Sequence, residues 1–168
     1  MTLAQVYVSG NVRRYHANPD MAHLGQTNAD HQGRCVQLLL GLHASPSVEL
    51  IKAVAHHDVG EMYASDLSGP FKAGHPALAE AHALIEQEYL RNMLGCDPVD
   101  GLANSDLWWL NFVDKLEAYC FMLTHASGEK LLHGWPTARE RIFSLAEARA
   151  GLRQNVAELI MYLDARAW

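Results

Sequence analysis

The stretch HHDVGEMYASDLSGPFK, residues 56–72, places two histidines and an aspartate in the middle of an apolar helical pattern. A glutamate, a second aspartate and a lysine follow within the same stretch. Burying a polar group without a partner costs about 2–7 kcal/mol, and burying an unpaired charge costs more. A bound metal ion is one way to compensate this cost. The stretch therefore indicates a functional site in helical surroundings.

The residues before this stretch predict a helix that buries one face. The apolar residues of 50–54 have the spacing of an amphipathic helix, and positions 57, 58 and 61 continue the same stripe. We therefore expect His57, Asp58 and Glu61 to point inward from one continuous helix. A single histidine on such a face is more often a hydrogen-bonded core residue than a metal ligand, so this segment alone decides nothing.

The whole chain predicts one all-α domain over residues 1–168. Its 168 residues and 49% hydrophobic content suit a single packed core. Residues 2–8 are compatible with a helix or with extended chain, and residues 9–20 with a loop. The expected helices cover 28–43 after a Thr27 cap, a segment from Ser45-Pro46 through Glu61, 76–94 before Gly95, a segment capped by Ser105, and 137–163 with a kink near Gly151. The expected architecture is a helical bundle of five or six main helices.

The composition of the chain limits which partners and which cellular location we expect. A net charge of −6 argues against binding duplex nucleic acid, which favours a basic face. No apolar run approaches the roughly 20 residues that cross a membrane. The cysteines form no CxxC pair, and with no apparent signal peptide they predict reduced thiols and a cytoplasmic location. The tryptophans and several apolar helix faces predict a homo-oligomer.

Ligand-type residues interrupt apolar stripes in three separate helical segments. His31 lies in the first turn of the helix that Thr27 opens, and Asp114 breaks the stripe of the helix after Ser105. Together with His57 and Asp58 they form a set of two histidines and two aspartates, which suits a divalent metal. The alternative for each aspartate is a helix cap or an ion-pair partner.

The order of these residues resembles the H…HD…D pattern of the HD-domain phosphohydrolases. The string HDVGEMYASDLSGPFK is similar to the signature of their 5′-deoxynucleotidase branch, in which HD is followed by Glu, Asp and Pro-x-Lys. That branch includes compact phage-type dATP triphosphohydrolases. The resemblance covers roughly residues 13–125 and implies the HD-domain helical fold. It implies that a divalent metal, such as zinc, cobalt, manganese or magnesium, is held by His31, His57, Asp58 and Asp114.

The resemblance also implies roles around the metal. Glu61 matches an acid that positions or deprotonates the attacking water, and Asp66 an acid near the ester oxygen and the sugar. Arg14 and Lys72 match phosphate-binding residues. Tyr15 matches the aromatic residue that packs against the sugar, although a tryptophan is the expected residue there.

The implied activity is hydrolysis of the 5′ phosphate ester of a deoxynucleotide, with release of the deoxynucleoside. A dNTP would yield triphosphate and a dNMP phosphate, and the compact chain favours the triphosphohydrolase. Independently of the resemblance, a metal, two carboxylates and nearby cations suit phosphate-ester hydrolysis. The alternatives are a dNMP 5′-deoxynucleotidase, an enzyme acting on another phosphate ester, and a non-catalytic nucleotide-binding regulatory protein.

Overall fold

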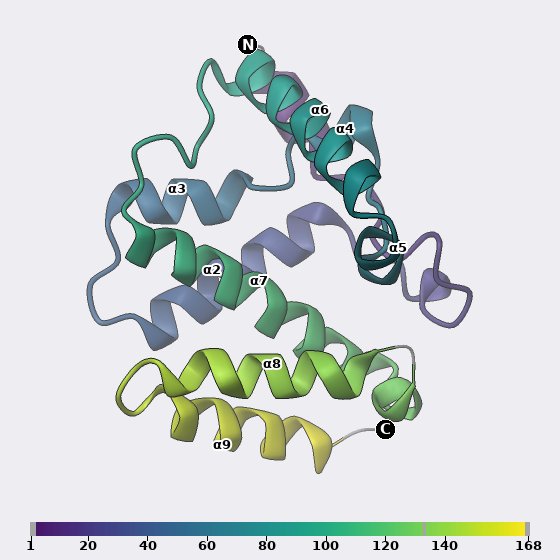
Figure 1. The fold of residues 1–168 in the computed structure, drawn as a ribbon, viewed down its shortest axis with the longest axis vertical. Helices are drawn as coiled ribbons and strands as arrows, with labels where there is room; N and C mark the ends of the chain where they lie inside the picture. Colours follow the sequence, from purple (N-terminus) through teal and green to yellow (C-terminus); the bar gives the residue numbers. More distant parts are fainter. Residues whose placement is uncertain (1–2, 133, 167–168) are drawn as a thin grey trace.

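The computed structural model describes residues 3–132 and 134–166, and within these ranges the chain is helical and forms no β-strand (Figure 1). The six longer helices have 9 to 22 residues, as expected for a bundle of five or six main helices. The elements in chain order are α1 (Leu3–Ser9), the 3-10 helix η1 (Ala22–Leu24), α2 (Asn28–Leu42), α3 (Val48–His56), α4 (Glu61–Ala64), α5 (Gly69–Gly74), α6 (Pro76–Leu94), α7 (Asn104–His125), the 3-10 helix η2 (Ser127–Leu131), α8 (Trp135–Glu147) and α9 (Leu152–Asp164). The all-α class is confirmed.

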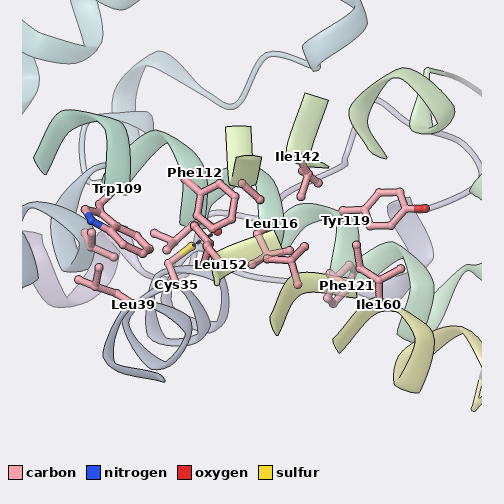
Figure 2. Close-up of a cluster of buried hydrophobic side chains, with 14 of the residues drawn as sticks. Cys35, Leu39, Trp109, Phe112, Leu116, Tyr119, Phe121, Ile142, Leu152 and Ile160 are labelled. Atoms are coloured by element: carbon pink, nitrogen blue, oxygen red, sulfur yellow. Dashed lines mark hydrogen bonds between the residues drawn. The ribbon is translucent and has the colours of Figure 1, made fainter. Parts of the chain in front are cut away.

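Helix α7 forms the centre of the molecule and contacts α2, α3, α8 and α9. In Figure 1, α8 and α9 lie side by side along one edge, and α6 lies on the opposite side with α4 and α5. The main core is built on the α7 residues Phe112 and Leu116, which are fully buried among side chains of α2, α8 and α9 (Figure 2). The side chains of α7 that lie outside this core are available to form a site.

Three predicted helix boundaries are confirmed. The Thr27 side chain accepts a hydrogen bond from the Asp30 backbone N–H, so Thr27 caps α2. Helix α6 begins at Pro76 and ends before Gly95, whose φ of 81° is the left-handed conformation that favours glycine at a helix end. Helix α1 settles the open question for residues 3–8, residue 2 lies outside the described residues, and the predicted loop over 9–20 starts one residue later than expected, because Ser9 ends α1. Residues 10–20 form turns, and Arg13 makes an isolated bridge with Thr27.

The predicted helix from Ser45-Pro46 through Glu61 was wrong at both ends. Ser47, not Ser45, caps α3, because its hydroxyl accepts from the Leu50 N–H and leaves Pro46 outside the helix. The helix ends at His56 instead of continuing through Glu61, and residues 57–60 form a turn. A β-carbon on Gly60 would lie 2.4 Å from the Glu86 carbonyl oxygen, so close contact with α6 leaves no room for another residue in that turn.

Two later predictions also need correction. Helix α7 begins at Asn104 after Ala103, and Ser105 lies inside the first turn instead of capping it. The predicted helix over 137–163 is not one kinked helix but two, α8 and α9, which reverse direction at a turn where Gly151 has a φ of 76°. Two short helices that fold back can both place apolar side chains against α7, which one long helix cannot.

The tryptophans do not supply the apolar surface on which the prediction of an oligomer rested. Trp109 is 5% exposed, and Trp108 and Trp135 are half-buried against the main core, whereas Trp168 lies outside the described residues. Exposed apolar side chains occur elsewhere, on α1 at Tyr7 and on α6. Oligomerisation stays a prediction. No helix within the described ranges has the length and apolar character needed to cross a membrane.

Candidate metal centre

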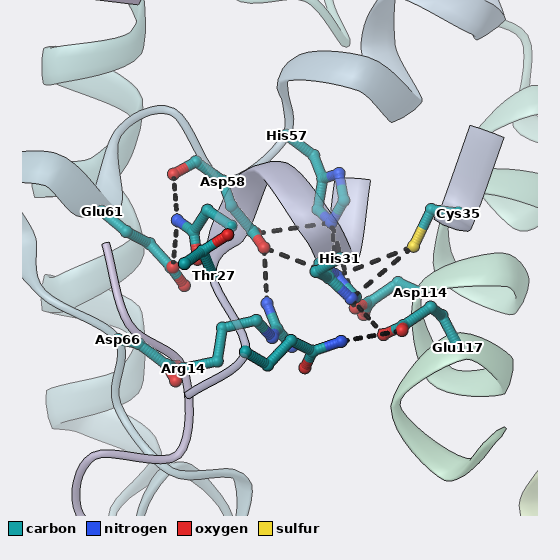
Figure 3. Close-up of polar contacts among 12 residues, drawn as sticks. Arg14, Thr27, His31, Cys35, His57, Asp58, Glu61, Asp66, Asp114 and Glu117 are labelled. Carbon is teal, nitrogen blue, oxygen red and sulfur yellow. Dashed lines mark hydrogen bonds and ion pairs between the residues drawn. The ribbon is translucent and has the colours of Figure 1, made fainter. Parts of the chain in front are cut away.

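Four predicted ligands from three segments meet at one place (Figure 3). His31 comes from the first turn of α2, His57 and Asp58 from the turn after α3, and Asp114 from the middle of α7. The Nε2 atom of His31 lies 3.2 Å from His57 Nε2, 3.2 Å from Asp114 Oδ1 and 3.5 Å from Asp58 Oδ2. The Nε2 atom of His57 lies 3.4 Å from Asp58 Oδ1 and 3.9 Å from Asp114 Oδ1.

All but the 3.9 Å separation are those expected between ligands of one metal ion. Nitrogen and oxygen ligands lie about 2.0–2.2 Å from zinc, so two of them at tetrahedral or right angles lie roughly 3–3.5 Å apart. His31 is fully buried, whereas Asp114 is 34% exposed, so the group is enclosed on the α2 side and open on the α7 side. The geometry thus combines a buried anchor with access from outside.

Each histidine makes a second hydrogen bond that fixes its orientation. The Nδ1 atom of His57 lies 2.9 Å from the Val54 carbonyl oxygen, which can only accept, so Nδ1 carries a hydrogen and Nε2 has a free lone pair. The Nδ1 atom of His31 hydrogen-bonds to the buried carboxylate of Glu117. Metal-binding histidines are commonly held in this way, by a backbone carbonyl or a carboxylate on the second ring nitrogen.

The group attracts positive charge. Burial lowers the pKa of His31, but its hydrogen bonds to Asp114, Cys35 and Glu117 outweigh burial and raise that pKa well above 6.5. Burial raises the pKa of Asp114, but the hydrogen bond with His31 and the charges of His57 and Arg14 lower it far below 3.8. Without a metal, a proton on His31 supplies the cation that the carboxylates need, and metal binding would displace this proton.

Cys35 adds another donor to the same place. It lies one turn after His31 on α2, and one ligand atom each of His31, Cys35 and His57 lie within 4.8 Å of one another. This group could hold a metal ion. Burial raises the pKa of the Cys35 thiol to about 11, and a cysteine binds metal as the thiolate. The carboxylates of Asp58 and Asp114 need no such deprotonation, which favours them as the anionic ligands.

Arg14 contacts the predicted metal ligands directly. Its Nη1 donates to Asp58 Oδ2 at 2.6 Å, and the side chain is 11% exposed. Burial lowers the pKa of Arg14, but the charge of Asp58 and those of nearby groups raise it above its usual value, so the guanidinium stays positive. Its Nε is buried and has no hydrogen-bond partner. A buried donor left free beside the metal ligands is suited to an anionic ligand.

Tyr15, next to Arg14, has a fixed and strained position. Its φ of 57° is uncommon for a residue with a β-carbon. Its ring stacks on Phe121 with centroids 5.8 Å apart and contacts Trp135. The hydroxyl is buried without a partner, and burial raises the pKa of Tyr15 to about 12. The aromatic ring is therefore held rigidly at the edge of the site.

Both predicted acids lie beside this group. Glu61 is 5% exposed, and its Oε2 accepts from Asn28 Nδ2 at 2.9 Å. Burial, with added repulsion from Asp58 and Asp66, raises the pKa of Glu61 to about 9. Asp66 Oδ2 accepts from the Tyr15 backbone N–H at 3.4 Å, which ties the loop of Arg14 and Tyr15 to the segment after α4.

Two lysines lie near acidic side chains. Lys72, predicted to bind phosphate, has its Nζ 3.9 Å from Glu86 Oε1 on α6, and its role at a phosphate stays a prediction. Lys115, next to Asp114 in the sequence, has its Nζ 3.9 Å from Asp114 Oδ2 and is 30% exposed. Its flexible four-carbon stem reaches back to the site although its α-carbon lies on the neighbouring face.

Supporting residues were missed from the sequence. Glu117 holds His31, and Gln26 donates to Glu117 at 2.8 Å. Asn28 donates to the carbonyl oxygen of Asp58 and to Glu61, and so fixes the turn that carries the HD pair. The sequence feature that could have identified Glu117 is its position three residues after Asp114, on the same inward face of α7.

Replacing Glu117 by glutamine is expected to weaken metal binding about 10- to 100-fold, the usual effect of losing an outer-shell partner. Glutamine keeps the size of the side chain but removes the negative charge that holds the His31 N–H. Competition against a metal-binding dye would measure the affinity, with Glu129→Gln, on the 3-10 helix η2, as the matched control. Equal affinities for the Glu117 variant and the wild type would contradict the role.

The chain was compared with protein-family models, with curated proteins and with solved structures, and none of them matches it. No family is therefore assigned, and the resemblance to the HD-domain phosphohydrolases stays a prediction. The basis for a function is the site itself, which brings two histidines, several carboxylates and a buried arginine together.

Proposed function

We propose that the protein is a metal-dependent phosphohydrolase of the HD-domain type that cleaves the 5′ phosphate ester of deoxynucleotides. The observation that carries this proposal is the meeting of His31, His57, Asp58 and Asp114 with their ring nitrogens and carboxylate oxygens 3.2 to 3.9 Å apart. The second hydrogen bonds of both histidines support it, because they direct the Nε2 atoms toward one point. These four residues would hold a divalent metal.

A divalent metal held there would lower the pKa of bound water and polarise a phosphoryl oxygen. Arg14 would bind an oxygen of the α-phosphate through its free Nε, and its Nη1 contact with Asp58 keeps it beside the ligands. Phosphate-ester hydrolysis needs placement and charge stabilisation more than covalent help from the protein. A fixed guanidinium with little exposure is suited to that task.

The two acids divide the proton transfers. Water attacks the α-phosphorus, Glu61 accepts the proton that the water loses, and the bond from phosphorus to the 5′ oxygen breaks. Asp66 supplies a proton to the leaving oxygen, so that the deoxynucleoside departs as an alcohol. The pKa of Glu61 near 9 describes the metal-free protein. Positive charge next to Asp58 would lower this pKa and allow Glu61 to act as a base.

We favour a dNTP over a dNMP as the substrate. Lys115 is 30% exposed and close to Asp114, and Arg34 lies one turn after His31 on α2. Lys115 is near enough to reach phosphates beyond the α-phosphate, and Arg34 would reach them by leaving its partner Asp30. The products would then be triphosphate and the deoxynucleoside. Lys72 pairs with Glu86 and would reach phosphate only by leaving that partner.

Deoxynucleotides should react faster than ribonucleotides, because the rigid Tyr15 ring beside Arg14 would leave a 2′-hydroxyl without a hydrogen-bond partner. Such a desolvated hydroxyl costs about 1–3 kcal/mol, or roughly a 5- to 150-fold difference in kcat/KM.

The test is incubation of metal-supplemented protein with dNTPs, dNMPs and the matching ribonucleotides, followed by chromatography of the products. Free deoxynucleoside is the expected product. Equal kcat/KM on ATP and dATP would contradict the sugar preference. A nucleotide with diphosphate as the products would show that a different bond is cut.

A further inference from the structure

Helix α6 supports the segment from Asp58 to Asp66 at three successive turns. Val59 packs in a small core with Leu90 and Met93. Gly60 lies directly against the backbone of Glu86, where a β-carbon would collide with the carbonyl oxygen. One turn earlier, His82 reaches the end of α4. The segment that carries one predicted ligand, Asp58, and the two predicted acids, Glu61 and Asp66, thus packs against one helix.

His82 makes the contact that matters most for Asp66. Its Nε2 donates to the carbonyl oxygens of Ala64 and Ser65 at 3.0 and 2.9 Å, and the side chain is 11% exposed. Both partners are acceptors only, so Nε2 carries the hydrogen. The Nδ1 atom lies 3.1 Å from Glu86 Oε1, but neither of these two buried atoms has a hydrogen-bond partner.

The backbone that His82 holds is strained. Ser65 has φ 68° and ψ 156°, a conformation that almost only glycine adopts. The next residue is Asp66, whose carboxylate accepts from the N–H of Tyr15, itself in the left-handed region. These are the two residues other than glycine with positive φ in the described part of the chain. Strain of this kind persists where surrounding contacts over-determine the backbone, and it is concentrated at functional sites.

We propose that His82 is a positioning residue for Asp66: its Nε2 hydrogen bonds hold the strained Ser65 turn and thereby place the Asp66 carboxylate beside Arg14 and Glu61. The assignment of an acid role to Asp66 rests on the proposed function. The placement itself rests on the contacts of His82 and the conformation of Ser65. Without these contacts the turn would relax to a conformation natural for serine, and Asp66 would move out of the site.

A substrate with a good leaving group separates this role from general loss of folding. A nucleoside alkoxide needs a proton to depart, whereas 4-nitrophenolate does not. His82→Ala should therefore lower kcat on the deoxynucleotide about 100-fold, the effect of misplacing a catalytic group by about 1 Å. It should change kcat on 4-nitrophenyl phosphate much less, and Asp66→Ala should show the same selectivity.

Two further variants test the mechanism. His82→Gln can still donate a side-chain N–H to the two carbonyl oxygens and should retain most of the selectivity. Adding Ser65→Gly to His82→Ala should restore part of the rate, because glycine adopts the Ser65 conformation without steric strain. His75→Ala, at an exposed histidine before α6, is the matched control and should behave as the wild type.

Amide hydrogen exchange of peptides covering residues 61–68 supplies a readout that does not depend on activity. Faster exchange in His82→Ala, with the wild-type rate in His82→Gln, is expected. Unchanged exchange in His82→Ala overturns the proposal, whether or not the protein turns over substrate. Faster exchange with equal losses on both substrates overturns the role toward Asp66. A wild-type protein that cleaves no deoxynucleotide would refute the proposed function, while the exchange result would still decide whether His82 holds the turn.

Discussion

Replacing Asp58 by alanine is expected to remove both the bound metal and the activity while the helical content stays. One carboxylate oxygen of Asp58 lies 3.4 Å from His57 Nε2, and the other lies 3.5 Å from His31 Nε2. Its loss leaves two neutral imidazoles and Asp114 to hold a dication. The affinity should fall by more than about 100-fold, the upper end of what loss of an outer-shell partner causes. Metal content after gel filtration and circular dichroism would measure the two effects.

The Asp58 variant also leaves Arg14 without its carboxylate. An unpaired buried charge can cost about 3–5 kcal/mol of stability, so Asp58→Asn, which keeps the side-chain volume and a hydrogen-bond acceptor for Arg14, is the second variant. Both should lack metal. Stoichiometric metal in a folded Asp58→Asn protein would show that Asp58 is not a required ligand.

Cys35→Ser is the matched comparison, because it separates the two possible donor sets. If the metal is held by His31, His57, Asp58 and Asp114, the serine variant keeps it. If the group of His31, Cys35 and His57 holds the metal instead, the serine variant loses it and the Asp58 variants keep it. The raised pKa of the Cys35 thiol and the ready charge of the carboxylates are the reasons to expect the first result.

Replacing Glu61 by glutamine should leave the metal in place and lower kcat about 10²- to 10⁴-fold, the range for loss of one general base. Glutamine keeps an oxygen that can accept from Asn28, so the turn of Asp58 should stay as it is. Metal content and single-turnover rates would be measured together. Glu49→Gln, at an exposed acid in the first turn of α3, is the control. Wild-type kcat at saturating substrate would remove Glu61 from the mechanism.

The stability of the metal-free protein gives an independent check on Glu61. Its pKa is raised from 4.5 to about 9 by burial first and then by Asp58 and Asp66, so the folded state disfavours the ionised form. The metal-free wild type should therefore lose stability as the pH rises from 4.5 toward 9. The glutamine variant lacks this loss and should melt no lower than the wild type at neutral pH.

The all-α class and three helix boundaries followed from local rules. Thr27, Pro76 and Gly95 act through their own backbone and side-chain geometry, so their effects are readable in the sequence. The ends of α3 and the turn between α8 and α9 were not readable in this way. They depend on packing between segments far apart in sequence, such as Gly60 against Glu86.

The inward direction of His57 and Asp58 was predicted from a helix that does not extend that far. The turn after α3 keeps hydrogen bonds of the three-residue type, from Val59 to His56 and from Glu61 to Asp58, so the chain winds on much as a helix would. The side chains therefore stay on the expected side although the helix ends. Glu117 and His82 act through tertiary contacts, and spacing along the sequence could not assign either of them a partner.

In the proposed function, the site directs water to the α-phosphorus of a deoxynucleotide when a metal is held by His31, His57, Asp58 and Asp114. Hydrolysis in ¹⁸O-labelled water, with mass spectrometry of both products, distinguishes this point of attack from any other. With added divalent metal the label should appear in the released triphosphate or phosphate and not in the deoxynucleoside, and Asp58→Asn should release neither product. Label in the 5′-hydroxyl of the deoxynucleoside, or equal turnover by the Asp58→Asn protein, would contradict the account.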